Sequence, residues 1–190
     1  MPRFSPASAL ATAFTGDAAR RLPLTEPEFL AMYARTAGPL AGYLRRLTGD
    51  AALAEDLLQD SYIRFLSVGR PPETDEHRKN YLFRIATNLA HDHFRSSKRR
   101  ETIADPAADP AAPAVADGRD VWRQLARLTP RDRELLLLAY VEGLTHQEIA
   151  QVTGLMRASV RPLLFRARQR FARVLRQVGL APDAIEKGAR

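Results

Sequence analysis

Apolar residues recur at helical spacing along most of the chain, and no segment alternates apolar and polar residues with a period of two. The pattern predicts an all-α protein. Its helices fall into two groups, separated by the stretch IADPAADPAAPAVADG, which has too few large apolar side chains to build a core. We therefore expect two small helical domains joined by a flexible acidic Ala/Pro linker. The expected boundaries are an N-terminal tail over 1–24, a first domain over 25–102, the linker over 103–117, a second domain over 118–178 and a C-terminal tail over 179–190.

Capping residues predict where the helices of the first domain begin and end. Thr25 and Glu28 have capping-box spacing at the start of the first helix, and Gly38-Pro39 is expected to bend or interrupt that helix. Gly49 ends it, and Asp50 can cap the next helix. Two further helices are predicted, over about 51–67 and about 78–98.

The second domain is predicted to hold four helices, of which the last two form a helix-turn-helix. Thr129-Pro130 caps one helix, which Gly143 is expected to stop. A second capping box at Thr145 opens a short helix that Gly154 ends, and the last helix follows over about 156–177.

Composition narrows the possible functions. The chain has no cysteine, which excludes disulfides and thiolate zinc sites, and its 45% apolar content is ordinary for a globular protein. No apolar run is long enough to span a bilayer, and the N-terminus lacks a secretory signal pattern, so we expect a cytoplasmic location. A net charge of +7 indicates a polyanionic partner, nucleic acid before anionic membrane.

The last helix is the strongest candidate for binding that partner. It carries seven arginines and no acidic residue, and arginine binds phosphates and guanine edges in a bidentate manner. The alternative is a solvated cationic face of an ordinary bundle helix. The candidate DNA-binding residues are Arg157, Ser159, Arg161, Arg166 and Arg168.

A second candidate surface lies on the helix over about 78–98. At 100° per residue its apolar residues fill one half, and an aromatic ring, an amide and arginines fall in one row on the opposite side. Such a row suits unstacked bases and a phosphate backbone, although an exposed polar face would look the same. The candidates are Tyr81, Arg84, Asn88, Asp92, Arg95, Lys98 and Arg99.

The helix over about 51–67 carries a cluster of acidic and amide side chains in this basic chain: Glu55, Asp56, Gln59 and Asp60. Asp56 and Asp60 are four residues apart and so lie on one face. The cluster is either a docking patch for a basic partner or a solvated face close to a helix N-terminus.

Three stretches resemble the extracytoplasmic-function (ECF) subfamily of bacterial RNA polymerase sigma factors: AEDLLQDSYIRFL, NYLFRIATNLAHDHFRSSKRR and LTPRDRELLLLAYVEGLTHQEIAQVTG. The resemblance covers about Glu28 to Val178. It implies a sigma factor that binds core RNA polymerase and directs promoter recognition, DNA melting and transcription initiation.

The resemblance also implies a role for each surface. The acidic helix would dock on polymerase, the row from Tyr81 would meet the promoter minus-ten element, and the loop from about Gly69 to Lys79 would capture a flipped base. The arginine helix would enter the major groove at the minus-thirty-five element. An anti-sigma factor is the further partner implied, and no cofactor or metal is expected.

Four positions depart from the family pattern. Leu163 stands where the family pattern has an arginine expected to bind phosphate. Tyr81 stands where many members have tryptophan, and Met156 is a poor N-cap. Pro162 lacks a backbone donor and crowds the carbonyl of Ala158, so it is expected to kink the first turn of the last helix.

Two other classes of function compete with this interpretation. A helical metal-dependent hydrolase could be built on His91 and His93, but residues two apart on a helix point in nearly opposite directions, and no phosphate loop or nucleophile elbow is present. A helix-turn-helix regulator that binds DNA without docking on polymerase is the closer alternative. The acidic helix and the two-domain layout count against it.

Overall fold

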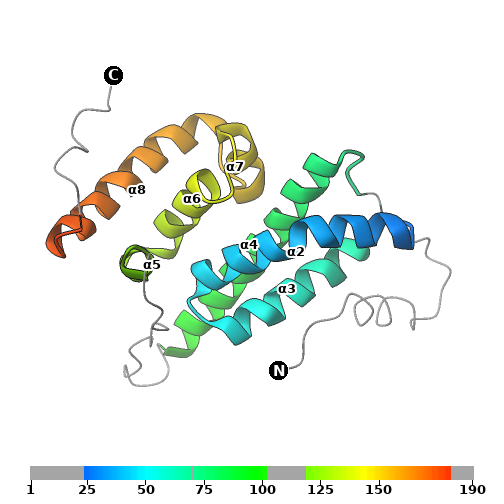
Figure 1. The fold of residues 1–190 in the computed structure, drawn as a ribbon, viewed down its shortest axis with the longest axis horizontal. Coiled ribbons are helices and arrows are strands. Elements are labelled where there is room, and N and C mark those ends of the chain that lie inside the picture. The colour runs from blue at the N-terminus through cyan, green and yellow to red at the C-terminus, as the bar shows by residue number, and fades with distance from the viewer. Residues whose placement is uncertain (1–23, 70, 102–118, 181–190) are drawn as a thin grey trace. The chain divides into compact units, whose positions relative to one another are not determined.

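The computed structural model describes residues 24–69, 71–101 and 119–180. In these ranges every regular element is an α-helix, and the helices form two compact units, α2 to α4 and α5 to α8 (Figure 1). The all-α prediction is confirmed. The linker expected over 103–117 lies outside the described residues, as does most of each expected tail.

The first unit is a three-helix bundle of α2 (Glu26–Thr48), α3 (Ala51–Leu66) and α4 (Asp75–Glu101), in which each helix packs on the other two. Its core is built from one apolar face of each helix, which accounts for the helical spacing in the sequence. The largest fully buried side chains are Phe29, Met32, Leu40, Tyr43, Leu44, Leu47, Tyr62, Phe65, Leu82 and Phe83.

The caps of α2 and α3 match the sequence prediction. Glu28 accepts hydrogen bonds from the backbone N–H of Thr25 at 2.8 Å and from its hydroxyl at 2.7 Å. Gly49 ends α2 in the left-handed region at φ 76°, and Asp50 then accepts from the first N–H groups of α3. This tight connection lets α3 fold back along α2.

Pro39 lies inside α2, which continues through it as one helix, so the expected interruption at Gly38-Pro39 does not occur. Both residues are exposed, and the missing hydrogen bond to the carbonyl of Arg35 therefore lies on the solvent side. On the opposite side, burial of Thr36 and Leu40 holds the helix against its neighbours.

The third helix is longer than predicted, because α4 begins at Asp75 rather than near residue 78. The Thr74 hydroxyl accepts from the N–H of His77 at 3.2 Å, and the Thr74 carbonyl from the N–H of Arg78 at 2.9 Å. The first turn thus forms directly after the Pro71-Pro72 pair, with acidic side chains where the helix dipole favours them.

Two buried hydroxyl pairs cross the bundle. Thr36 on α2 bonds Tyr62 on α3 at 2.7 Å, and Tyr43 on α2 bonds Thr87 on α4 at 2.9 Å. All four residues are buried, and burial raises the pKa of Tyr62. Each pair satisfies polar atoms that would otherwise be costly inside the core.

The second unit comprises α5 (Arg119–Ala126), α6 (Pro130–Tyr140), α7 (His146–Thr153) and α8 (Arg157–Gln177). α6 and α5 both pack on α8. Its core contains Leu125, Leu128, Leu135, Leu136, Leu137, Leu138, Leu144, Ile149, Val152, Val160, Leu164 and Ala167.

Local sequence signals also set the helix ends of this unit. Thr129 caps α6 through the N–H of Asp132 at 3.2 Å, and Thr145 forms the predicted capping box that opens α7. α6 ends at Tyr140, before Gly143, whose φ of 68° belongs to the turn toward α7. Gly154, at φ 71°, makes the turn from α7 into α8 and completes a helix-turn-helix.

Candidate nucleic-acid interface

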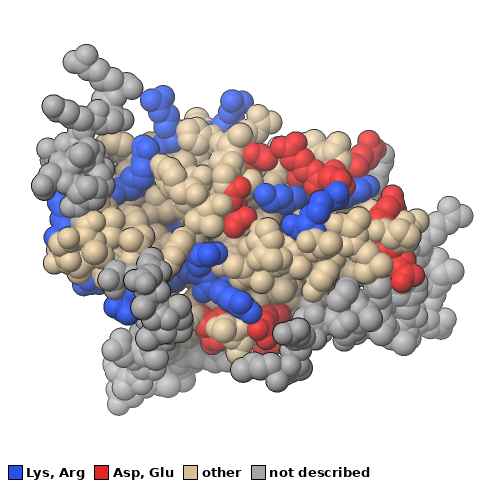
Figure 2. Space-filling model, viewed as in Figure 1, with Lys and Arg blue, Asp and Glu red and all other residues tan. Residues whose placement is uncertain are grey.

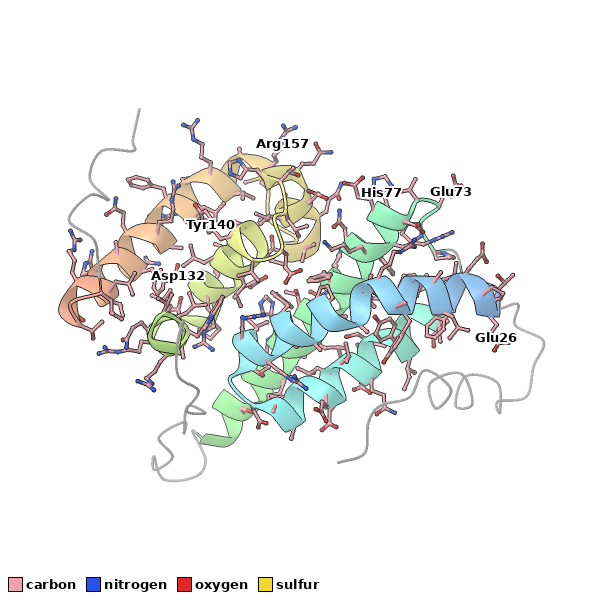
Figure 3. All side chains as sticks on the ribbon, in the orientation of Figure 1. Glu26, Glu73, His77, Asp132, Tyr140 and Arg157 are labelled. Carbon is pink, nitrogen blue, oxygen red and sulfur yellow. The ribbon has the colours of Figure 1, made fainter. Side chains whose placement is uncertain are left out.

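The start of α8 exposes a basic surface. Arg157 and Arg161 are exposed and Ser159 is half-buried, while Met156 at the N-cap makes no side-chain hydrogen bond to the helix. The first turn contains no acidic residue, so the N–H groups at the helix start and the helix dipole both favour an anion. Figure 3 shows Arg157 at this end of the helix.

Pro162 does not break α8, which runs without interruption from Arg157 to Gln177. Its neighbours Val160 and Leu164 are buried, whereas Pro162 and Ala158 are exposed. The gap in the hydrogen-bond ladder therefore lies on the solvent side. Packing of the opposite face keeps Arg161 within one continuous helix, while the kink expected at Pro162 stays a prediction.

Two of the later arginines on α8 have partners within the unit, so the arginine row is only partly free for a polyanion. Arg168 donates to the Tyr140 hydroxyl at 3.1 Å, and Arg170 donates from one nitrogen to both carboxylate oxygens of Asp132 at 2.8 Å. The Asp132 side chain is 6% exposed, which makes this ion pair a link between α8 and α6. Figure 3 shows Asp132 and Tyr140 on α6, and Figure 2 shows basic side chains over α8.

The remaining arginines of α8 extend the basic surface. Arg166 is exposed and donates to the carbonyl of Pro162 at 3.4 Å, within its own helix. Arg173 and Arg176 are also exposed. These side chains can reach a phosphate backbone without leaving a buried carboxylate unpaired.

The polar row on α4 lies on the side of the helix opposite the core. Arg84, Asn88, Asp92 and Arg95 are exposed, with Arg95 3.8 Å from Asp92. Tyr81 is half-buried, and its ring meets that of Phe65 edge-on at 6.2 Å between centroids. The ring is therefore held in place and presents part of its surface. The side chains of Lys98 and Arg99 lie outside the described residues.

The acidic cluster lies on α3. Asp56 and Asp60 are exposed and Gln59 is half-buried, while Glu55 pairs with Arg45 of α2 at 3.0 Å. The three acidic residues differ accordingly, because one already has a basic partner within the bundle. Asp56 and Asp60 are the carboxylates best placed for an external cation.

Neither a metal centre nor a membrane-spanning helix occurs in the described ranges. No group of three or more His, Asp or Glu side chains there could hold a metal ion. None of the described helices is both long and apolar enough to cross a membrane.

Comparison with known proteins matches each unit to a domain family. The model of sigma-70 region 2 matches residues 32–100, and the model of sigma-70 region 4 matches residues 118–171. RNA polymerase sigma factor CarQ of Myxococcus xanthus is 30% identical over 158 residues, which is 78% of this chain and 90% of that protein. ECF RNA polymerase sigma factor SigM of Bacillus subtilis is 30% identical over 139 residues, or 67% and 83% of the two chains. The chain belongs to the ECF RNA polymerase sigma factors.

A solved structure agrees on the fold of this sigma factor. The sigma factor RpoE, in complex with the anti-sigma factor NepR from Bartonella quintana, has a TM-score of 0.66 and 23% identity over 78% of this chain and 97% of that chain. The family resemblance expected from the sequence is confirmed, and with it the function of a sigma factor in promoter recognition and transcription initiation.

Sequence reasoning missed two groups in this sigma factor. Asp132 was not among the candidate residues, and nothing in the sequence links it to Arg170, which lies 38 residues later. Arg78 fell outside the polar row of its helix, yet it binds the loop before α4, donating to the carbonyl of Pro72 at 2.9 Å. Both are contacts between segments, which helical periodicity does not reveal.

Proposed function

We propose that this sigma factor uses three separate surfaces: the acidic face of α3 for core RNA polymerase, the polar row of α4 for the minus-ten element, and the start of α8 for the minus-thirty-five element. In this proposal the region-two domain spans 25–102 and the region-four domain 118–178, with 103–117 as the linker.

The polymerase-docking assignment rests on Asp56 and Asp60, with Glu55 and Gln59 beside them. The two aspartates are exposed, and neither is needed for the buried core. Exposed carboxylates on a basic protein select a basic partner, and they can steer association without contributing to the stability of the fold.

The minus-ten assignment rests on the row from Tyr81 to Arg95, extended in sequence by Lys98 and Arg99. A half-buried aromatic ring can stack on an unpaired base, and the exposed amide of Asn88 can donate to and accept from base edges. The exposed Arg84 and Arg95 supply charge for the phosphates of a single strand.

The minus-thirty-five assignment rests on the observation that carries the proposal as a whole: α8 begins with exposed arginines at the N-terminus of the second helix of a helix-turn-helix. Recognition helices in this motif contact base edges through their N-terminal residues. Arg157, Ser159 and Arg161 occupy that end, and Arg166 lies one turn further, where phosphate contacts are expected. Arg168 is assigned to DNA less directly, because it also bonds Tyr140.

Regulation and location follow the same proposal. RpoE was solved in complex with the anti-sigma factor NepR, and CnrH in complex with the cytosolic domain of CnrY. We infer that an anti-sigma factor also binds this chain. We expect action in the cytoplasm as a regulator without catalytic activity of its own, since polymerase supplies the chemistry. No cofactor is invoked.

Run-off transcription with core RNA polymerase on fragments of the source genome tests the proposal. The full chain should produce defined transcripts, and R161A should reduce their number or yield. A chain that shifts DNA alone but neither binds core polymerase nor starts transcripts would instead be a helix-turn-helix regulator without polymerase docking.

A further inference from the structure

The loop that leads into α4 is tied to the bundle by one arginine. Arg78 donates from Nε to the carbonyl of Pro72 at 2.9 Å and from Nη1 to Oδ1 of Asp75 at 3.2 Å. Its side chain is only 19% exposed. The guanidinium therefore lies against the protein, with two of its donors aimed at different parts of the loop and helix start.

Asp75 extends this link to another helix. Its second oxygen, Oδ2, accepts from Arg35 of α2 at 2.7 Å. The Pro72 carbonyl, the start of α4 and the middle of α2 are thus joined in one chain of contacts. We call Arg35, Asp75 and Arg78 the clamp.

The charge of the clamp arginine also affects a carboxylate in the first turn of α2. The pKa of Glu28 is lowered mainly by the hydrogen bond from the backbone N–H of Thr25, and the charge of Arg78 acts in the same direction. The charge of Arg78 thus acts on carboxylates of two helices, Glu28 of α2 and Asp75 of α4.

The backbone that the clamp holds is already stiff. Pro71 and Pro72 have fixed φ angles and no N–H, so this part of the loop cannot form its own backbone hydrogen bonds through those positions. The Pro72 carbonyl is left as the acceptor, and Arg78 is its partner. Lysine could not replace this interaction, since its single ammonium lacks the planar fork that reaches two acceptors at once.

We propose that Arg78 is a positioning residue for promoter recognition, which fixes the loop before α4 in the shape that selects a base of the melted strand. The inference rests on the proposed function of region two, together with the base capture that the family resemblance implies for this loop. Arg78 itself touches no DNA in this mechanism. It lowers the number of loop conformations before binding, so that the captured base meets a formed site.

The test uses the full chain bound to core RNA polymerase and a single-stranded DNA library with randomised bases, whose bound fraction is sequenced. R78K retains the charge and loses the fork. Base preference at one position should fall about fivefold, the value of one hydrogen bond of about 1 kcal/mol, while the preferences at the other positions persist. The same substitution at exposed Arg131 of α6, R131K, is the matched control and should leave the whole profile unchanged.

A second variant distinguishes loss of the clamp from a general loss of folding. R35Q removes only the exposed end of the clamp, where both side chains are 56% exposed, so the bundle should melt at the same temperature. It should weaken the same base preference to a smaller extent. An unchanged profile in both R78K and R35Q, with normal melting temperatures, overturns the inference.

A loop variant separates failure of the clamp from failure of the proposed function. P71G/P72G makes the loop backbone more flexible without changing the clamp side chains. It should reduce the base preference at the same position. A flattened profile in this variant but not in R78K rejects the clamp and leaves base capture by the loop standing. No change in P71G/P72G rejects base capture by the loop, and the positioning role falls with it.

Discussion

The ion pair between Arg170 and Asp132 predicts a structural role for one arginine of the basic helix α8. R170A should destabilise the region-four unit rather than simply remove a phosphate contact. Asp132 is 6% exposed, so removing its partner leaves a buried carboxylate. The Asp132 carboxylate also accepts a hydrogen bond from the Thr129 hydroxyl at 2.8 Å.

The size of the effect can be estimated from the contacts. Both oxygens of Asp132 accept from Arg170 at 2.8 Å, and hydrogen bonds to charged groups are worth about 1.5–3 kcal/mol. The Arg170 side chain is 51% exposed, and solvent screening reduces the value of the pair. The position of Asp132 in the first turn of α6 also stabilises its charge. We expect a loss of about 2 kcal/mol, below the cost of a fully buried broken pair.

Urea unfolding, followed by tryptophan fluorescence, can measure the loss of stability in R170A in the full chain. Trp122 is its only tryptophan and lies on α5, so its emission reports the region-four unit. With a slope of about 1 kcal/mol per molar for so small a unit, the midpoint should fall by about 2 M. R173A is the control, because Arg173 is exposed, and its effect should stay within about 0.5 kcal/mol.

Two results would refute this reasoning. One is an equal midpoint for R170A and R173A. The other is an unchanged midpoint for R170A together with a DNA-binding salt slope reduced by about one unit, which is the behaviour of a phosphate contact.

Three further predictions follow from the proposed surfaces. D56K/D60K should weaken binding to core polymerase in a titration while leaving the melting temperature nearly unchanged, since both residues are exposed; unchanged affinity would remove the docking assignment. Y81A should lose about 1–3 kcal/mol of binding to the melted strand, and permanganate footprinting should show a smaller bubble; a normal bubble would mean that the ring does not stack. R161A should cost about 1–3 kcal/mol and relax one promoter position, whereas R166A should weaken all sequences alike and lower the salt slope by about one unit; identical behaviour of the two would end the distinction between base and phosphate contacts.

The sequence predicted the helices and most of their ends because those depend on neighbours within one turn. The capping boxes at Thr25 and Thr145, and the glycine turns at Gly49 and Gly154, need only local geometry. Of the bend or interruption expected at Gly38-Pro39, the interruption does not occur, since burial of the residues beside Pro39 holds the helix together on the other side.

The surfaces could be predicted only in part. Helical spacing placed Arg84, Asn88 and Arg95 together on one exposed face. The structure confirms that all three side chains are exposed. It could not show that Arg170 is held by Asp132, since the two residues meet only through packing of α6 on α8. Charge counting treats every arginine alike, whereas tertiary contacts decide which of them remain available.

The two hydroxyl pairs of the region-two bundle bear on how polymerase and promoter are aligned. The face proposed for polymerase belongs to α3 and the face proposed for the minus-ten strand to α4, and each helix is bonded to α2, through Thr36–Tyr62 and Tyr43–Thr87 respectively. Packing of apolar side chains alone would permit small rotations of one helix against another. A hydrogen bond between two hydroxyls restricts that rotation, because it requires a narrow range of distance and angle. Loss of one hydroxyl would leave the bundle folded and let one face turn relative to the other. In the proposed arrangement, these four buried oxygen atoms fix the angle between the polymerase-binding face and the promoter-binding face.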